Sequence, residues 1–170
     1  MCAWVKTTKQ DAAILSWGKD APGQKWTFRT QTGNGNNGAL RVEVNGGYRV
    51  GNQNVADNSW HHVAAVFPDG ATDINQIIFY VDGAPEGSYS GVTPELVNTA
   101  ADMDVQIGND HSNRYFQGLI DDVRIYDFAL SAPEIATIYN GVNNSSWDSN
   151  VTIAGGPQEA GNKSILLTGL

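Results

Sequence analysis

The chain has 170 residues, of which 16% are charged, and its 19 glycines often stand beside Asn or Asp. The formal net charge of −8 argues against a nucleic-acid partner, because binding to phosphates requires clustered lysine and arginine side chains. No apolar run approaches the roughly 20 residues that a helix needs to span a bilayer, so membrane insertion is not expected. A chain of this length suits one domain with a sizeable core, built from short strands and tight turns.

Segments of strand-like sequence follow one another along the chain and are separated by turns. The predicted strands are 1–8, 12–17, 25–30, 40–44, 48–50, 59–67, 77–81, 84–89, 105–108 and 118–126. The sequences at 45–47 (NGG) and 82–83 (DG) are typical of hairpin turns. Residues 31–38 (QTGNGNNG) predict a loop whose residues adopt positive φ, and 90–102 predict an irregular crossover. We therefore predict an all-β antiparallel sandwich.

The segment 118–141 combines the last predicted strand with one short helix. Period-two alternation places on one face of the strand Leu119, Asp121, Val123 and Ile125. Ser131 can cap a helix over 131–140, and Glu134 lies three residues on, where it closes a capping box. Gly141 follows as a stop signal.

Several of these segments also carry a family resemblance. The sequences SWHHVAAVF at 59–67 and IIFYVDG at 77–83, with segment 118–141, resemble laminin-G-like domains of the concanavalin A-like lectin/glucanase superfamily. The resemblance implies a two-sheet jelly-roll sandwich with one short helix near 131–140. It also implies a noncatalytic module of a secreted or cell-surface multidomain protein. Glucanases on this fold use a Glu-x-Asp-x-Glu or Glu-x-Asp-x-x-Glu triplet, and the chain has neither, so we do not expect an enzyme.

The tail, 142–170, extends beyond the usual end of this family and resembles the family's beginning. The sequence GGPQEAGNKSILLTGL at 155–170 is similar to the lead-in and first strand that normally precede the strand at residue 3. We expect one domain over 1–170, with 155–170 supplying that first strand. It would do so within its own sandwich, as in a circular permutant, or in a strand-exchanged dimer. The alternative is that the tail begins a second tandem domain.

Two loops combine aromatic rings with polar side chains in the way that a sugar site requires. A flat ring stacks on the apolar face of a pyranose, while Asn, Asp, Arg and His form hydrogen bonds with the hydroxyls. The candidate residues are Asp110, His111, Asn113, Arg114 and Tyr115 in one loop, and Tyr48 and Arg49 in the other. The predicted partner is a polysaccharide or glycan. The alternative is a protein-interaction or structural adhesion module that binds no sugar.

The remaining expectations concern the core and a metal. The aromatic residues expected in the core are Trp4, Trp17, Trp60 and Phe67, whereas Trp26 is expected near a loop. If the face of Asp121 is the core face, that carboxylate is buried and must be paired or coordinated. Because relatives on this fold bind Ca2+ near a sandwich edge, calcium is the candidate cofactor, with Asp121 and Asp104 as ligands. His61 and His62 are expected to be structural, and Cys2 to be a buried free thiol.

Overall fold

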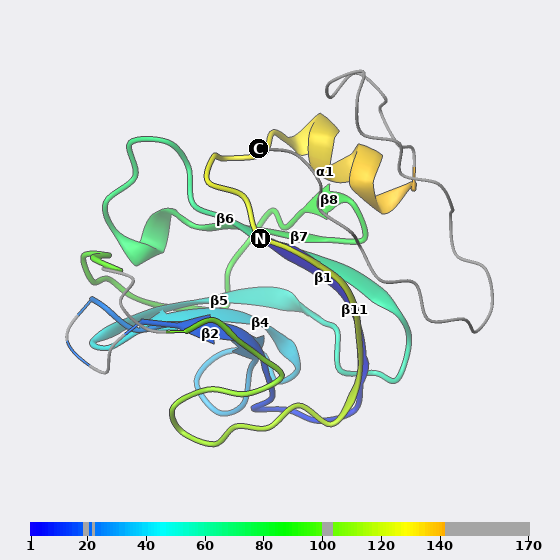
Figure 1. Cartoon of the computed structure of the whole chain (residues 1–170), viewed down its shortest axis with the longest axis horizontal. Helices are drawn as coiled ribbons and strands as arrows, with labels where there is room; N and C mark the ends of the chain where they lie inside the picture. The colour runs from blue at the N-terminus through cyan, green and yellow to red at the C-terminus, as the bar shows by residue number, and fades with distance from the viewer. Residues whose placement is uncertain (19–20, 22, 100–103, 142–170) are drawn as a thin grey trace.

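The computed structural model describes residues 1–18, 21, 23–99 and 104–141, and shows two antiparallel β-sheets packed face to face (Figure 1). One sheet contains β1 (Cys2–Thr7), β6 (His61–Val66), β7 (Ile78–Val81), β8 (Ala84–Pro85) and β11 (Gly118–Arg124). The other contains β2 (Ala13–Trp17), β3 (Trp26–Thr30), β4 (Ala39–Val44), β5 (Gly47–Asn54), β9 (Gly91–Thr93) and β10 (Gln106–Ile107). The predicted two-sheet all-β architecture is confirmed.

The order of the strands defines which strands form the two edges of each sheet. The five-stranded sheet runs β11-β1-β6-β7-β8, and the six-stranded sheet runs β10-β2-β3-β4-β5-β9. A short 3-10 helix, η1 (Ile74–Gln76), precedes β7, and an α-helix, α1 (Ala132–Tyr139), follows β11. No helix in the described ranges is long and apolar enough to cross a membrane. The predicted first strand at 155–170 lies outside the described residues.

Most predicted strands are found, with two differences between β7 and β10. The strand expected over 84–89 is reduced to Ala84–Pro85, although the Glu86 N–H still donates to the Phe79 carbonyl oxygen over 2.8 Å. Within the crossover expected over 90–102, residues Gly91–Thr93 form β9, which pairs with β5.

The core lies between the two sheets, and on β3 and β4 its residues alternate with polar ones. Phe28 on β3 faces Phe79 on β7, with ring centroids 6.5 Å apart. Trp26, expected near a loop, is buried in this core. Trp60, expected in the core, is exposed because it precedes the first paired residue of β6, and that prediction is wrong.

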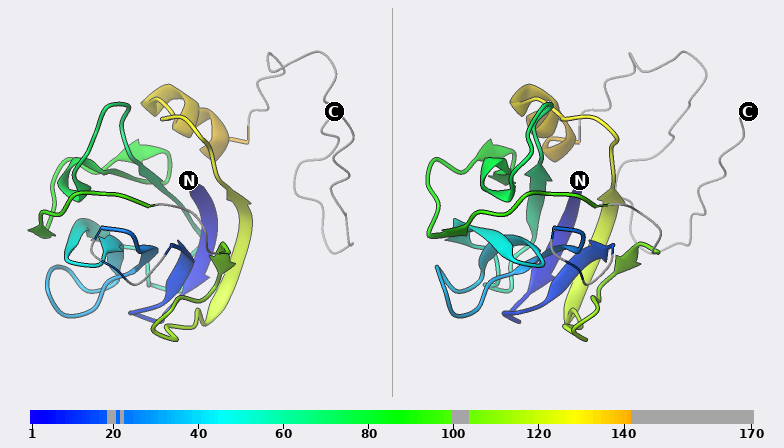
Figure 2. Two further views of the ribbon diagram at one scale, coloured as in Figure 1. Left: turned by 60° about the vertical axis from the view of Figure 1, so that its left-hand side comes forward. Right: turned by 90° about the vertical axis from the view of Figure 1, so that its left-hand side faces the viewer.

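The helix α1 covers part of the outer face of the five-stranded sheet (Figures 1 and 2). Ser131 caps it as predicted, since its N–H and its hydroxyl each donate to the Glu134 carboxylate over 2.7 Å. A second apolar cluster forms beneath the helix from Cys2, Ala64, Val66, Tyr80, Leu130 and Ile135. The prediction that Cys2 is a buried free thiol is therefore confirmed.

A β-bulge interrupts β11 where it pairs with β1. Trp4 pairs with Asp121, but Cys2 pairs with Arg124, so three steps along β11 oppose two steps along β1. Asp122 adopts a φ of 47°, in the left-handed region that Asp tolerates better than most residues. The extra residue reverses the alternation of inward and outward side chains from this point on.

The bulge corrects the expected position of Asp121. Ile120 and Val123 pack against the core, three residues apart instead of two. Leu119 and Asp121 therefore point away from the core and are exposed. The prediction that Asp121 and Val123 share one face of the strand is therefore wrong, because strict period-two reading cannot foresee an inserted residue. The condition for a buried Asp121 carboxylate is not met.

Candidate functional site

The outer face of the six-stranded sheet carries a cluster of charges around Glu43 on β4. The guanidinium nitrogens of Arg29, Arg41 and Arg114 lie 3.0, 2.8 and 2.5 Å from its carboxylate oxygens, and Lys25 Nζ lies 3.3 Å away. The Glu43 side chain is only 8% exposed. Burial alone would raise the pKa of Glu43, but the hydrogen bond from Arg114 and the charges of Arg29, Arg114 and Arg41 lower it well below its usual range.

This cluster holds two of the predicted sugar ligands. Asp110 is 1% exposed and accepts hydrogen bonds from the backbone N–H groups of Ser112 and Arg114. Its carboxylate also accepts from Arg114 Nε over 2.6 Å. His111 Nε2 lies 2.8 Å from the carbonyl oxygen of Gly18. The polar groups of Asp110 and Arg114 are thus committed to internal contacts that fix the loop 109–115.

The other predicted sugar ligands divide between two surfaces. Tyr48 pairs with Glu43 across the sheet, and the Arg41 guanidinium lies 3.9 Å from the Tyr48 ring centroid. Arg49, the next residue, points to the opposite face and stacks on Tyr89 at 3.4 Å. The structure therefore brings Tyr48 and the charged cluster together and places Arg49 elsewhere. In the loop 109–115, Asn113 and Tyr115 are exposed, and the Tyr115 hydroxyl donates to Asn113 Oδ1 over 3.1 Å.

The two predicted metal ligands lie in different segments of the chain. Asp104 is exposed just before β10, and Asp121 is exposed on β11, where its Oδ1 accepts the N–H of Asp122 over 2.8 Å. Within the described part of the chain, no group of three or more His, Cys, Asp or Glu side chains is arranged to hold a metal ion. Calcium binding stays a prediction.

His61 and His62 point to opposite sides of β6 and differ in their surroundings. His61 Nδ1 lies 2.8 Å from Asp82 Oδ2, and its Nε2 lies 3.1 Å from Asp57 Oδ1. Burial lowers the pKa of His61, but the hydrogen bonds and charges of Asp82 and Asp57 outweigh burial, so the pKa lies above its usual value. His61 therefore links β6 to the turn after β7.

We expect the imidazole of His61 to titrate above 6.5, its ordinary pKa, when followed by NMR, and to titrate lower in Asp82→Asn. Because the folded pKa is raised, the stability from this contact is fully present below about pH 6.5 and is lost as the pH rises through the folded pKa. The amide oxygen of the introduced asparagine would still accept the His62 N–H, so the variant removes the charge and keeps that hydrogen bond. An unchanged titration midpoint in Asp82→Asn would contradict this assignment.

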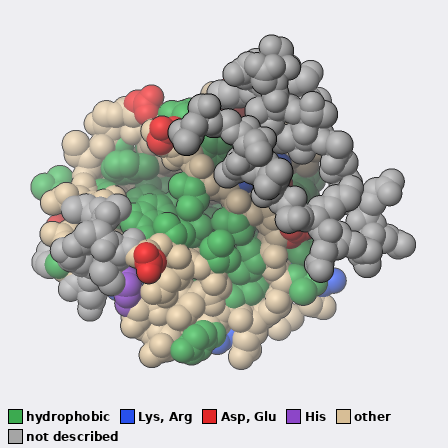
Figure 3. Space-filling model, viewed as in Figure 1, with side chains coloured by type: hydrophobic (Ala, Val, Ile, Leu, Met, Phe, Trp, Pro, Cys, Tyr) green, Lys and Arg blue, Asp and Glu red, His purple; other side chains and the backbone are tan. Residues whose placement is uncertain are grey.

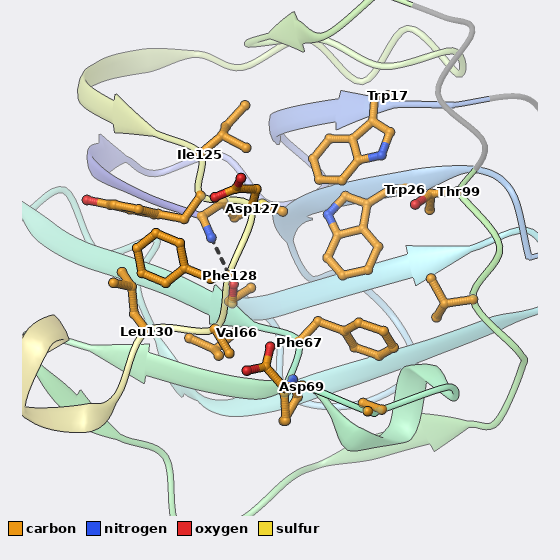
Figure 4. A pocket seen from close by; sticks show the side chains of 18 residues that line it. Trp17, Trp26, Val66, Phe67, Asp69, Thr99, Ile125, Asp127, Phe128 and Leu130 are labelled. Carbon is orange, nitrogen blue, oxygen red and sulfur yellow. Dashed lines mark hydrogen bonds between the residues drawn. The ribbon is translucent and has the colours of Figure 1, made fainter.

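An aromatic cleft opens between the sheets at one end of the sandwich. It has a volume of about 440 Å³. Trp17 on β2 and Trp26 on β3 stack with ring centroids 5.2 Å apart, and Phe67 meets Trp26 edge-on at 6.2 Å. Figure 4 shows the two tryptophans side by side, with Phe128 across from them. Figure 3 shows apolar side chains gathered in a hollow on this face of the molecule.

Polar groups accompany the aromatic walls of this cleft. Asp69 and Asp127, both exposed, contribute carboxylates from the loop after β6 and from the segment after β11 (Figure 4). The indole N–H of Trp26 is buried and has no hydrogen-bond acceptor among the described residues. The cleft thus joins flat apolar surfaces with carboxylate acceptors.

The sequence did not predict this cleft, because its walls come from segments far apart in the chain. Trp17 was expected in the core and Trp26 near a loop, whereas the pairing of β2 with β3 places them opposite each other. The alternation in 25–30 does place Trp26 and Phe28 on one face, which was the available signal. Nothing local to Trp17 indicates its partner.

Comparison with known proteins agrees with the architecture. Residues 1–136 match the laminin G family model described as the concanavalin A-like lectin/glucanases superfamily. The chain belongs to this superfamily. No curated protein matches this concanavalin A-like chain significantly.

One solved structure supports the same fold. It is domain 4 of AbnA, an extracellular GH43 arabinanase from Geobacillus stearothermophilus, in complex with arabinotriose. The TM-score is 0.60 at 21% sequence identity, over 81% of the present chain and 64% of the AbnA chain. At this level of sequence identity, the similarity shows that the two domains share a fold.

Proposed function

We propose that this concanavalin A-like domain is a noncatalytic module that binds a glycan in the aromatic cleft. The observation that carries the proposal is the stacked pair Trp17 and Trp26 in a cleft of about 440 Å³ that also contains two carboxylates. Ligand pockets of about 300–1,000 Å³, mostly apolar with a few polar groups, are typical of small-molecule sites. The arabinotriose bound to the AbnA domain supports a sugar as the ligand class.

The chemistry of recognition follows from the lining residues. The apolar face of a sugar ring would stack on Trp17, the more exposed of the two tryptophans, and Phe128 would cover the other side. The carboxylates of Asp69 and Asp127 would accept hydrogen bonds from sugar hydroxyls. Binding would need no covalent step.

The two carboxylates of the cleft are also the reason why we propose a noncatalytic module. Glycoside hydrolysis uses two carboxyl groups, one of them kept protonated in a water-poor environment. Asp69 and Asp127 are the acidic residues found in the described lining, and both are exposed to water.

The proposal places the module outside the cell and includes calcium as a cofactor to be tested.

Trp17→Ala is expected to weaken glycan binding at least about tenfold, the equivalent of 1.4 kcal/mol, because the stacking surface is lost. The probes are arabinotriose and a panel of polysaccharides, titrated by calorimetry with calcium and again with EDTA. Loss of binding in EDTA alone would show calcium dependence. No binding of any probe in either condition would overturn the glycan proposal.

The controls separate recognition from folding. Trp60→Ala removes an exposed tryptophan that does not line the cleft, so its affinity should equal that of the wild type. Phe128→Ala removes a ring that is 42% exposed, and should weaken binding with little loss of stability. Equal affinity in wild type, Trp17→Ala and Phe128→Ala would place the sugar elsewhere.

A further inference from the structure

Apolar side chains remain exposed along one side of the sandwich. Val105, Ile107, Leu119 and Ile125 are each at least half exposed. They belong to or adjoin β10 and β11, the edge strands of the two sheets on this side. Edge strands with a bare ladder and apolar side chains are sites for the addition of another strand.

The two edges converge in space. Both views of Figure 2 show β10 beside β11. A Cβ atom built on Gly108, which follows β10, would lie 3.8 Å from Cδ1 of Ile120 on β11. Ile120 and Val123 are only partly buried although they pack against the core. The open side of the core is therefore lined from both sheets, and one strand added to β11 would cover it.

We propose that residues 164–170 (SILLTGL) of the chain's own tail pair with the edge of β11 that has no partner strand among the described residues. In an extended segment, Ile165 and Leu167 point to one side and Leu166 to the other. Ile165 and Leu167 would cover the opening beside Ile120, while Leu166 would lie next to Leu119 on the outer face. The proposal is independent of glycan binding.

The length of the connecting chain and the charges at the edge favour residues 164–170 over a second copy of β11 as the partner strand. The roughly 20 residues between the end of the described chain and Ser164 can extend on the order of 60 Å, about twice the diameter of a small domain. Two β11 edges would bring together the Asp121 carboxylates of both copies, which repel, whereas the charge of Asp122 is already paired with Arg124. The side chains of residues 164–170 are uncharged, and Lys163 immediately before them is attracted to the Asp121 carboxylate.

Disulfide trapping in the full chain tests the proposed pairing. Leu119→Cys and Leu166→Cys are introduced together in a Cys2→Ala background, since cross-strand neighbours lie within the reach of a disulfide. We expect an intramolecular disulfide after mild oxidation. The matched control combines Leu119→Cys with Val151→Cys, a tail position outside the segment, and should not cross-link. A disulfide between two chains, or equal cross-linking in the control, would overturn the proposal.

Hydrogen exchange supplies a second measurement that does not depend on the register. The β11 amides that do not bond to β1 should exchange at least about tenfold faster in Leu166→Asp/Leu167→Asp than in the wild type. The amides of the opposite edge strand, β8, should exchange equally in both proteins. Equal exchange at β11 in the two proteins would show that the segment does not cover this edge, whatever the cross-linking result.

Discussion

Glu43→Gln is expected to lower the free energy of unfolding by about 3–5 kcal/mol, the usual cost of breaking a buried ion pair from one side. Glu43 is the acceptor shared by Arg29, Arg41, Arg114 and Lys25, so its neutralisation removes a counter-charge from four cations at once. Arg29 and Arg114 keep a second carboxylate each, from Asp11 and Asp110. Urea-induced unfolding at pH 7, followed by tryptophan fluorescence, measures the change.

The matched control is Asp122→Asn on β11. Its partner is Arg124, and the two side chains are 39% and 40% exposed, so the pair should contribute less than about 1 kcal/mol. Asn also tolerates the positive φ of this position. Equal, small losses in both variants would mean that the Glu43 cluster does not stabilise the fold.

The pH dependence of the Glu43 contribution has a fixed sign. Because the folded pKa of Glu43 is lowered, its contribution is present above its ordinary pKa of 4.5 and is lost as the pH falls through the folded value. The wild type should therefore lose stability in acid more steeply than Glu43→Gln. This comparison isolates Glu43 because both proteins contain the same other carboxylates.

How far the sequence predicts this molecule depends on whether each signal is local. The helix α1 was predicted with its cap, because Ser131, Glu134 and Gly141 carry the information within one segment. The bulge at Asp122 was not predicted, since it depends on how β11 pairs with β1. One inserted residue was enough to turn a carboxylate expected in the core towards water.

The same distinction between local and distant signals explains which residues of the candidate sites could be predicted. Asp110 and Arg114 looked like sugar ligands because a polar loop with an aromatic residue is their only local context. Their partner, Glu43, lies on a distant strand. A signal was present in the alternation of Arg41 and Glu43 with apolar residues, which places opposite charges together on one strand face. For the aromatic cleft the alternation in 25–30 indicated only the face of Trp26, because the folded sheets alone bring Trp17 against Trp26.

His62→Phe is expected to remove a large part of the acid sensitivity of the domain. His62 is 1% exposed, and neither ring nitrogen has a hydrogen-bond partner among the described residues. Its ring lies 5.5 Å from that of Trp4 and 6.1 Å from that of Tyr139. Burial is the main cause that lowers the pKa of His62 from 6.5 to about 4, and nearby Asp122, Arg124 and Asp82 have smaller effects.

The sign and size of this acid sensitivity follow from the difference between the pKa of His62 in the folded chain and its pKa in the unfolded chain. The unfolded chain takes up the proton near pH 6.5, whereas the folded chain resists it until about pH 4. The contribution of His62 to stability is therefore fully present above about pH 6.5 and is lost as the pH falls to about 4. The loss is on the order of 3 kcal/mol, because each pKa unit corresponds to about 1.4 kcal/mol. His61 acts in the opposite direction and is present in both proteins.

The measurement is the free energy of unfolding of wild type and His62→Phe at intervals between pH 4 and pH 7.5. Subtracting one curve from the other cancels the carboxylates, Glu43 included, and leaves the contribution of His62. Phenylalanine keeps a flat ring against both Trp4 and Tyr139 and removes two nitrogens without partners among the described residues, so the variant should match or exceed the wild type at pH 7. A difference curve that is flat over this range would mean that His62 is protonated as readily in the folded domain as in the unfolded chain. In that case its nitrogens must reach water or an acceptor, and the packing of α1 over β6 would be looser than the ring contacts indicate.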